Sequence, residues 1–257
     1  MRFIDAHIHL ADPEYLSKID QVLSNARENS VVGLVANAMD LTTSRVTLSL
    51  SQIHPGVIFP AIGIHPWETH LASDDDIEEV VNLILSEKGP AVSVGEVGLD
   101  REYSSEAKDL DRQRIVFQSM LRAAEAAQLP VSVHSRAAFQ EVLEILASFE
   151  LTNVLLHWYS GPLELIPEII SRGYYISVGP SSVYVTKIQE IAKRIPLTQL
   201  LVETDGPVRY EGVFKGKLTV PSFLMEVAKN LARVKGGQVE EVSETIFENT
   251  KRFLGLV

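Results

Sequence analysis

The apolar positions of this chain form short uninterrupted runs, separated by longer stretches in which apolar and polar residues recur with helical spacing. Most of the runs are rich in Val, Ile and Leu and lack polar alternation, which is typical of strands buried on both faces of a parallel sheet. The pattern predicts eight strands: Phe3–His7, Val31–Asn37, Val57–Ile64, Ala91–Glu96, Val131–His134, Val154–His157, Tyr174–Val178 and Leu200–Glu203.

Helical stretches connect these runs, and two more follow the last run. The predicted helices are Glu14–Glu28, Thr42–Ile53, Asp74–Leu85, Glu106–Ala127, Ala137–Phe149, Leu163–Ile170, Val183–Arg194, Ser222–Val234 and Val239–Phe253. Asp74 is expected to cap the third helix, and the acidic residues that follow it suit the positive end of the helix dipole. Pro130 is expected to end the fourth helix just before its strand.

Strand and helix alternate without a break, which is the signature of an α/β fold. The length of 257 residues is usual for one (β/α)8 barrel. The chain shows no repeat, low-complexity tract or linker. We therefore predict an α/β protein, a (β/α)8 TIM barrel, with a single domain over residues 1–257. The longest irregular segment, Gly206–Val220, follows the last strand, where a barrel carries active-site loops.

Composition narrows the class of protein. No window approaches the ~18 uncharged apolar residues of a membrane helix, and the N-terminus enters the first strand directly, without room for a signal peptide. We expect a cytoplasmic protein with no membrane contact. The absence of cysteine excludes disulfides and thiolate ligands. The formal net charge of −11 argues against broad adhesion to nucleic acid, although bound cations can supply positive charge locally.

Six side chains of the kinds that bind metals follow predicted strands. They are His7, His9, Glu96, His134, His157 and Asp205. Because the carboxyl ends of the strands of a barrel meet on one face, these side chains are expected to converge there. Imidazoles and carboxylates together form a nitrogen and oxygen cluster that suits divalent cations. The pattern therefore predicts a metal-dependent hydrolase.

The separate signals differ in weight. His7 and His9 are two residues apart and point to the same side of a strand, so both are able to reach one ion. Glu96 lies between glycines that leave space near its carboxylate, which is able to bridge two cations. His134 and His157, either of which alone would read as a hydrogen-bonded core histidine, occupy equivalent positions of successive strands.

Asp205 and two further residues complete the predicted site. Asp205 is placed to bind a metal and to take a proton from bound water, although an Asp-Gly turn is the ordinary alternative. His65, after the third strand, is predicted to face substrate. Arg136, two residues beyond His134, is predicted to clamp a phosphate or a carboxylate. His54 and His70 read as ordinary surface residues.

The order of the motifs carries a resemblance. DAHIHL, GIHPWE, GEVGLD, VSVHSR, HWYSG and ETDGP occur in this order, and the chain resembles the TatD family of metal-dependent deoxyribonucleases, in the amidohydrolase-like barrel superfamily, from Ile4 to the C-terminal helix. The resemblance implies two divalent ions. The first would be held by His7, His9, Glu96 and Asp205, and the second by Glu96, His134 and His157. It also implies that His65 and Arg136 contact substrate and that the reaction releases nucleotides from a DNA 3′ end.

Departures from the family pattern affect the DNA contacts. The family often reads His-Cys-Phe-Ser-Gly where this chain has His157-Trp158-Tyr159-Ser160-Gly161, and the basic-Asn pair of the loop after Asp205 is replaced. A hydrolase of a small ester, lactone or amide is therefore the alternative enzyme, with a small phosphoester also possible as substrate. A non-catalytic metal-binding protein is the third reading, which the presence of Asp205 and Glu96 disfavours.

The predicted metal site has a specific geometry. Two cations about 3.5–4 Å apart, bridged by Glu96, would lower the pKa of a bound water from ~15.7 towards ~7, and Asp205 would accept its proton. His and carboxylate ligands accept Mg, Mn or Zn, so the sequence does not choose among these ions. Nor does it indicate an oligomeric state.

Overall fold

The computed structural model describes residues 1–86, 91–104 and 106–256. Eight parallel strands form a single sheet in chain order, β1 to β8. The strands are β1 (Phe3–Ile8), β2 (Val31–Asn37), β3 (Ile58–Ile62), β4 (Ser93–Gly98), β5 (Val131–His134), β6 (Val154–Leu156), β7 (Tyr175–Val178) and β8 (Leu200–Val202). Each strand pairs in parallel with the next, as in a sheet that curls toward closure.

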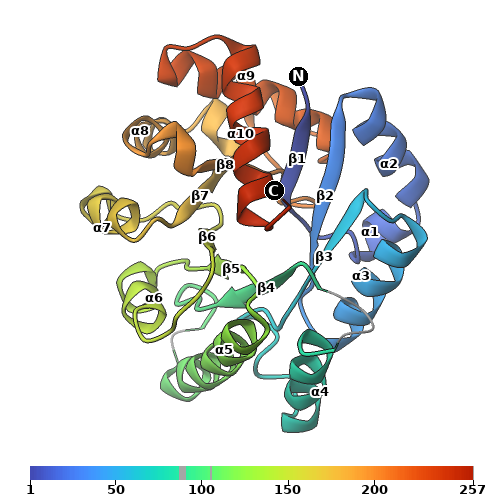
Figure 1. Ribbon diagram of the computed structural model, residues 1–257, viewed down its shortest axis with the longest axis vertical. Helices are drawn as coiled ribbons and strands as arrows, with labels where there is room; N and C mark the ends of the chain where they lie inside the picture. The colour runs from blue at the N-terminus through green and yellow to red at the C-terminus, as the bar shows by residue number, and fades with distance from the viewer. Residues whose placement is uncertain (87–90, 105, 257) are drawn as a thin grey trace.

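Helices surround the strands (Figure 1). They are α1 (Pro13–Leu16), α2 (Ile19–Glu28), α3 (Leu41–Ile53), α4 (Asp74–Ile84), α5 (Ala107–Ala127), α6 (Phe139–Leu146), α7 (Ile166–Ser171), α8 (Thr186–Arg194), α9 (Leu224–Lys235) and α10 (Val239–Phe253). The arrangement is a nearly closed (β/α)8 TIM barrel in one domain, and the predicted fold class is confirmed. None of the helices among the described residues is both long and apolar enough to cross a membrane.

Two hydrophobic clusters hold the barrel together. The larger one packs one face of the strands against the surrounding helices. The smaller one joins Ile4 of β1, Val35 of β2, Leu155 of β6 and Leu201 of β8, which meet only through the barrel interior. Phe253 of α10 belongs to the same cluster and is fully buried, so α10 closes the end of the barrel where β1 begins. The opposite end is left for the strand-end loops.

Hydrogen bonds join β1 to the segment after β8 and form the seam of the barrel. The amide of Asp205 donates to the carbonyl of His7, and the amide of His9 donates to the carbonyl of Gly206, both at 2.8 Å. The buried carboxylate of Asp5 accepts from the amide of Thr204 at 2.9 Å. Burial raises the pKa of Asp5 to about 7, although the hydrogen bonds that its carboxylate accepts from Thr204 and from the His7 amide act in the opposite direction. The seam therefore fixes the first and last predicted metal-binding segments beside each other.

The strand β4 corrects a predicted boundary. We predicted a strand that ends at Glu96, but β4 continues to Gly98, so Glu96 lies within it. Gly98 has a φ of 144° and pairs with His134, and a Cβ at Gly98 would come within 2.0 Å of the His134 carbonyl oxygen. Only glycine permits this close approach, which brings β4 and β5 together beside the site.

The first helix was predicted wrongly as one piece, Glu14–Glu28. The structure has a short α1, which Asp12 caps by accepting a hydrogen bond from the Glu14 amide. The separate helix α2 begins after Lys18, whose own dihedral angles are not helical. The break turns Tyr15 into the core, where its hydroxyl donates to the Thr219 carbonyl at 2.7 Å. Tertiary packing therefore overrides helical periodicity at this position.

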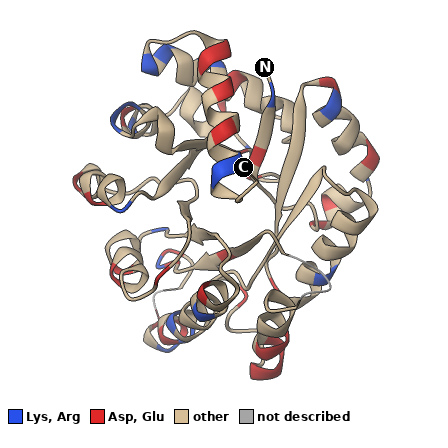
Figure 2. Ribbon diagram, viewed as in Figure 1, with Lys and Arg blue, Asp and Glu red and all other residues tan. Residues whose placement is uncertain are grey.

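Smaller differences concern helix ends. Ser73, not Asp74, caps α4: its hydroxyl accepts from the Asp76 amide while the Asp76 carboxylate accepts from the Ser73 amide. Leu163–Leu165, Pro180–Val183 and Pro221–Phe223 are 3₁₀ turns that precede α7, α8 and α9. The helices of Figure 2 carry Lys and Arg interspersed with Asp and Glu, in keeping with the net charge of −11.

Candidate metal centre

Glu96 lies at the centre of the cluster, and each of its two carboxylate oxygens faces a different set of side chains. Its Oε2 lies 3.1 Å from His7 Nε2 and 3.3 Å from His9 Nε2. The Oδ1 of Asp205 completes this set at 3.6 Å from His7 Nε2 and 3.4 Å from His9 Nε2. The two imidazole nitrogens are 3.2 Å apart. This first set therefore brings two nitrogens and two carboxylate oxygens to one point.

The other oxygen of Glu96 faces the histidines of later strands. Its Oε1 lies 2.6 Å from His134 Nδ1 and 2.6 Å from His157 Nε2, and these two nitrogens are 3.4 Å apart. His65 also approaches, with its Nε2 at 3.2 Å from Glu96 Oε1. The six residues predicted as ligands are thus brought together by five different strands or strand ends, and His65 lies beside them.

The hydrogen-bond partners of the outward imidazole nitrogens show which ring nitrogens are available to bind a cation. His9 Nδ1 lies 3.1 Å from the Asn37 carbonyl, and His134 Nε2 lies 2.8 Å from a carboxylate oxygen of Asp100. Both partners only accept hydrogen bonds, so the outward nitrogens carry protons. When each ring gives up its second proton, the inward nitrogen is left with the lone pair that a cation needs. His7 Nδ1 lies 3.1 Å from the Ser132 hydroxyl, which can accept in the same way.

His65 has the reverse arrangement. Its Nδ1 accepts from the amide of Trp67 at 3.1 Å, so a neutral His65 carries its proton on the inward Nε2. Burial lowers the pKa of His65 to about 4, more than the nearby Glu96 raises it, which keeps the ring neutral at pH 7. Although His65, Glu96 and His134 are close enough together to hold an ion, the tautomer makes His65 a hydrogen-bond donor instead.

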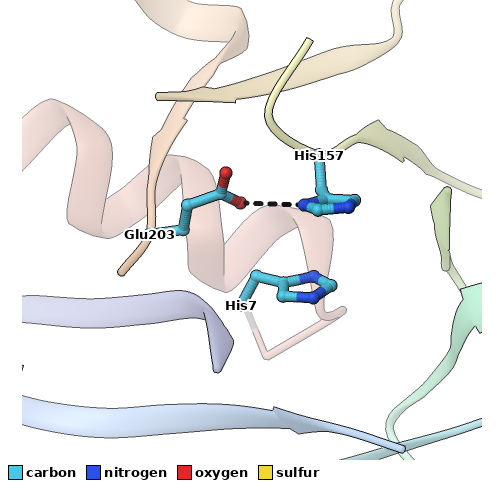
Figure 3. A group of neighbouring side chains, drawn as sticks. All are labelled: His7, His157 and Glu203. Carbon is cyan, nitrogen blue, oxygen red and sulfur yellow. Dashed lines mark ion pairs between the residues drawn. The ribbon is translucent and has the colours of Figure 1, made fainter. Parts of the chain in front are cut away.

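Glu203 is a buried acid for which the sequence predicted no role. Figure 3 shows Glu203 on the chain after β8, pointing toward His157. The Nδ1 of His157 is 3.7 Å from Glu203 Oε2. The rings of His7 and His157 are stacked, with their centroids 4.0 Å apart. Among the described residues, His157 Nδ1 and Glu203 Oε1 have no hydrogen-bond partner. The spacing of Glu203 and Asp205, which matches that of His7 and His9, was the available signal.

Charges within the cluster compensate each other. Burial would lower the pKa of His9, but hydrogen bonds to Asp205 and Glu96 outweigh it and raise the pKa to about 10. Burial would raise the pKa of Glu96, but His157, His65 and His7 hold it well below the usual value. Positive charge from protons thus offsets the buried carboxylates. Divalent cations would provide the same compensation, and a donor set of imidazole nitrogens and carboxylate oxygens fits such ions.

Asp100, a second acid with no predicted role, connects the cluster to its surroundings. It is fully buried, and its Oδ2 lies 2.8 Å from His134 Nε2. The same oxygen accepts from Trp67 Nε1 at 2.7 Å and from Arg136 Nε at 2.9 Å. Burial alone would raise the pKa of Asp100, but the hydrogen bonds from these three side chains lower it. Its position in the GEVGLD motif was the only sequence signal.

A cavity of about 810 Å³ opens over the cluster, and its wall includes His9, Glu96, His134, His157 and Asp205. His65, Trp67, Arg136 and Trp158 also line it. The side chain of Arg136 is 41% exposed, and the described residues leave its terminal nitrogens without a hydrogen bond. The predicted surface histidines lie elsewhere: His54 ends α3 and His70 is exposed.

Comparison with known proteins identifies the family to which the chain is related. A family model described as TatD related DNase matches residues 4–255. The human protein named deoxyribonuclease TATDN3 is 31% identical over 254 residues, which cover 96% of this chain and 92% of that protein. The Bacillus subtilis protein YabD, named an uncharacterized metal-dependent hydrolase, is 30% identical over 96% of this chain and 97% of its own length.

A solved structure agrees with these relatives. The TatD homolog YjjV from Escherichia coli superposes with a TM-score of 0.91 at 26% identity, over 98% of this chain and 97% of that one. A TatD family hydrolase from Entamoeba histolytica, at 19% identity, shares the fold with a TM-score of 0.84. The chain belongs to the TatD-related DNase family of metal-dependent hydrolases.

Proposed function

We propose that this protein is a divalent-metal-dependent deoxyribonuclease that removes nucleotides from the 3′ end of DNA. The observation that carries the proposal is the division of donor atoms between the two oxygens of Glu96, because a carboxylate in this position suits two ions. Family membership and the name of the human relative, deoxyribonuclease TATDN3, support the choice of substrate.

Two divalent ions are part of the proposal, with Mg, Mn or Zn as the candidates. His7, His9, Glu96 and Asp205 would hold one ion, and Glu96, His134 and His157 would hold the other. Bound there, the ions would lower the pKa of a water molecule, so that hydroxide is available to attack phosphorus at neutral pH. They would also offset negative charge on the phosphate.

The protein's own side chains would perform the remaining work. Asp205 is catalytic in this proposal and accepts the proton of the attacking water; nearby histidines outweigh the effect of burial and lower its pKa, so the carboxylate is free to accept. Glu96 is catalytic through its position between both donor sets. His65 would donate a hydrogen bond from its Nε2 to a phosphate oxygen and keep the proton, and Arg136 would bind a phosphate with its free terminal nitrogens.

The alternative, a hydrolase of a small ester, lactone or amide, is not favoured by the relatives named for an activity. No observation in the cavity selects such a substrate. A cytoplasmic location remains a prediction from the sequence, and the oligomeric state is not part of the proposal.

The decisive experiment is the digestion of a 5′-labelled single-stranded oligonucleotide with Mg²⁺ or Mn²⁺. We expect a ladder of products shortened from the 3′ end, whereas a circular single strand should stay intact. Because few basic groups are available to phosphates, the salt dependence should be shallow, at about 0.7 in the log–log slope for each phosphate contacted. Turnover of a small ester or lactone without release of nucleotides by any divalent metal would contradict the proposal.

The first prediction concerns His65. His65→Ala is expected to keep the full metal content and to lower kcat by about 10²–10³, because it removes a hydrogen-bond donor to the phosphate and no metal ligand. The matched control is His157→Ala, which should lose bound metal. Elemental analysis and initial rates measure both effects. Loss of metal from the His65 variant equal to that from the His157 variant would show that His65 is a ligand.

The second prediction concerns Arg136. Arg136→Ala is expected to raise KM for the oligonucleotide roughly 10-fold to 100-fold, since a hydrogen bond to a charged group contributes about 1.5–3 kcal/mol. Metal content should be unchanged. Arg101→Ala is the control, because Arg101 pairs with Glu141 on the surface and does not line the cavity. An unchanged KM in the Arg136 variant would remove this residue from phosphate binding.

A further inference from the structure

Two aromatic rings lie together at the rim of the cavity over the metal centre. Trp67 follows β3 and lines the cavity, while Tyr103 lies in the loop after β4. Their ring centroids are 5.4 Å apart and their planes differ by 20°, so the two rings are stacked. Tyr103 is 48% exposed, which leaves a large part of its ring surface open to solvent. An exposed stack of this kind beside a cavity suggests a binding surface.

The stack is held rigidly by one buried carboxylate. Asp100 Oδ2 accepts from Trp67 Nε1 at 2.7 Å, and Asp100 Oδ1 accepts from the Tyr103 amide at 2.9 Å. The same oxygen accepts from the Glu102 amide at 2.9 Å, which fixes the loop that carries Tyr103. These bonds fix the Trp67 ring and the backbone that carries Tyr103 before any ligand arrives, and a preorganised surface loses little side-chain entropy on binding.

The stack begins next to the proposed catalytic centre. The Trp67 ring lies 4.8 Å from the His65 ring and 6.4 Å from the His134 ring, measured between centroids. The guanidinium of Arg136 lies 5.4 Å from the centre of the Trp67 ring. A strand whose phosphate reaches the cluster past Arg136 would thus have its neighbouring base beside the aromatic pair.

The charges around the cavity favour stacking over phosphate binding. Four other basic residues of the strand-end loops already have partners. Arg101 pairs with Glu141, Arg209 with Glu14 and Lys215 with Glu211, and Lys217 donates to the Val213 carbonyl. The chain as a whole carries a formal net charge of −11. Few basic side chains are therefore free to bind phosphates away from the metal centre, whereas every nucleobase offers a flat face for stacking.

We propose that Trp67 and Tyr103 form a stacking platform for the bases of a single DNA strand whose end lies in the metal centre. The proposal rests on the proposed nuclease function and adds to it the part of the substrate that this chain grips. It explains how an acidic enzyme holds a nucleic acid strand, and it predicts a preference for unpaired bases, since a duplex keeps its base faces covered.

The test measures binding apart from hydrolysis. Metal-free protein in EDTA is titrated into a 5′-labelled single-stranded oligonucleotide, and into an abasic deoxyribose-phosphate strand of equal length, with fluorescence anisotropy as the readout. Tyr103→Ala should bind the base-bearing strand about tenfold more weakly at low and at high salt, and the abasic strand as well as the parent does. The control Tyr103→Phe, which keeps the ring, should bind both strands like the parent.

The possible results distinguish failure of the stacking platform from failure of the proposed nuclease function. If the parent digests DNA but Tyr103→Ala binds the base-bearing strand with unchanged affinity, the platform is overturned and the nuclease stands. The platform also falls if the variant loses affinity for the abasic strand to the same degree, because Tyr103 would then contact the backbone. If the parent neither binds nor digests single-stranded DNA with any divalent metal, the nuclease itself is refuted, and the platform with it.

Discussion

Asp205→Asn is expected to lower kcat by about 10²–10⁴ while the barrel persists, because an amide cannot take a proton from water. Asparagine is the right replacement at this position for two reasons. It is nearly the same size as aspartate, and it tolerates the left-handed backbone that Asp205 adopts, with a φ of 47°. The bond from the amide of Asp205 to the carbonyl of His7 is a backbone contact and should remain.

The measurement is the initial rate on the single-stranded oligonucleotide, at metal contents matched by elemental analysis. Circular dichroism shows whether the fold is kept. A rate within about threefold of the parent at equal metal content would remove Asp205 from the role of base.

Glu96→Gln should have an even larger effect, with bound metal falling from two ions to at most one per chain. Glu96 is the residue whose two oxygens face both donor sets, and an amide provides one acceptor and one donor in their place. Changes to residues that merely orient ligands already weaken metal binding by about 10-fold to 100-fold, so the loss of a ligand atom should exceed this range. Activity should fall at least as far as in the Asp205 variant.

Metal stoichiometry after gel filtration, together with the melting temperature of the chelated protein, tests this expectation. The chelated variant should unfold in one transition like the chelated parent, which separates a lost ligand from a lost fold. Two ions retained with parental affinity would refute the bridging role of Glu96.

The sequence was sufficient to predict the barrel because its buried strands are continuous apolar runs. Val31–Asn37 and Val131–His134 have the predicted bounds, as does the last helix. Prediction failed where distant contacts decide the local structure. The break between α1 and α2 depends on the contact of Tyr15 with a loop some 200 residues later, and no local pattern encodes it.

The candidate site shows the same division. Side chains after successive strands had to converge once the strands were parallel, so the cluster itself followed from the order of the motifs. The tautomer of His65 did not follow, because it depends on one backbone amide, that of Trp67. Asp100 and Glu203 could be seen in their motifs, but their roles depend on contacts with His134 and His157 from other strands.

The seam between β1 and the segment after β8 has a consequence for how the protein opens. Proposed metal ligands lie on both sides of it, His7 and His9 on one and Asp205 on the other, so a bound cation would act as a cross-link between segments about 200 residues apart in the chain. Chelation should therefore speed amide hydrogen exchange at His9 and Asp205. At a free metal concentration 100 times the Kd, this cross-link would add about 2.7 kcal/mol to the free energy of unfolding.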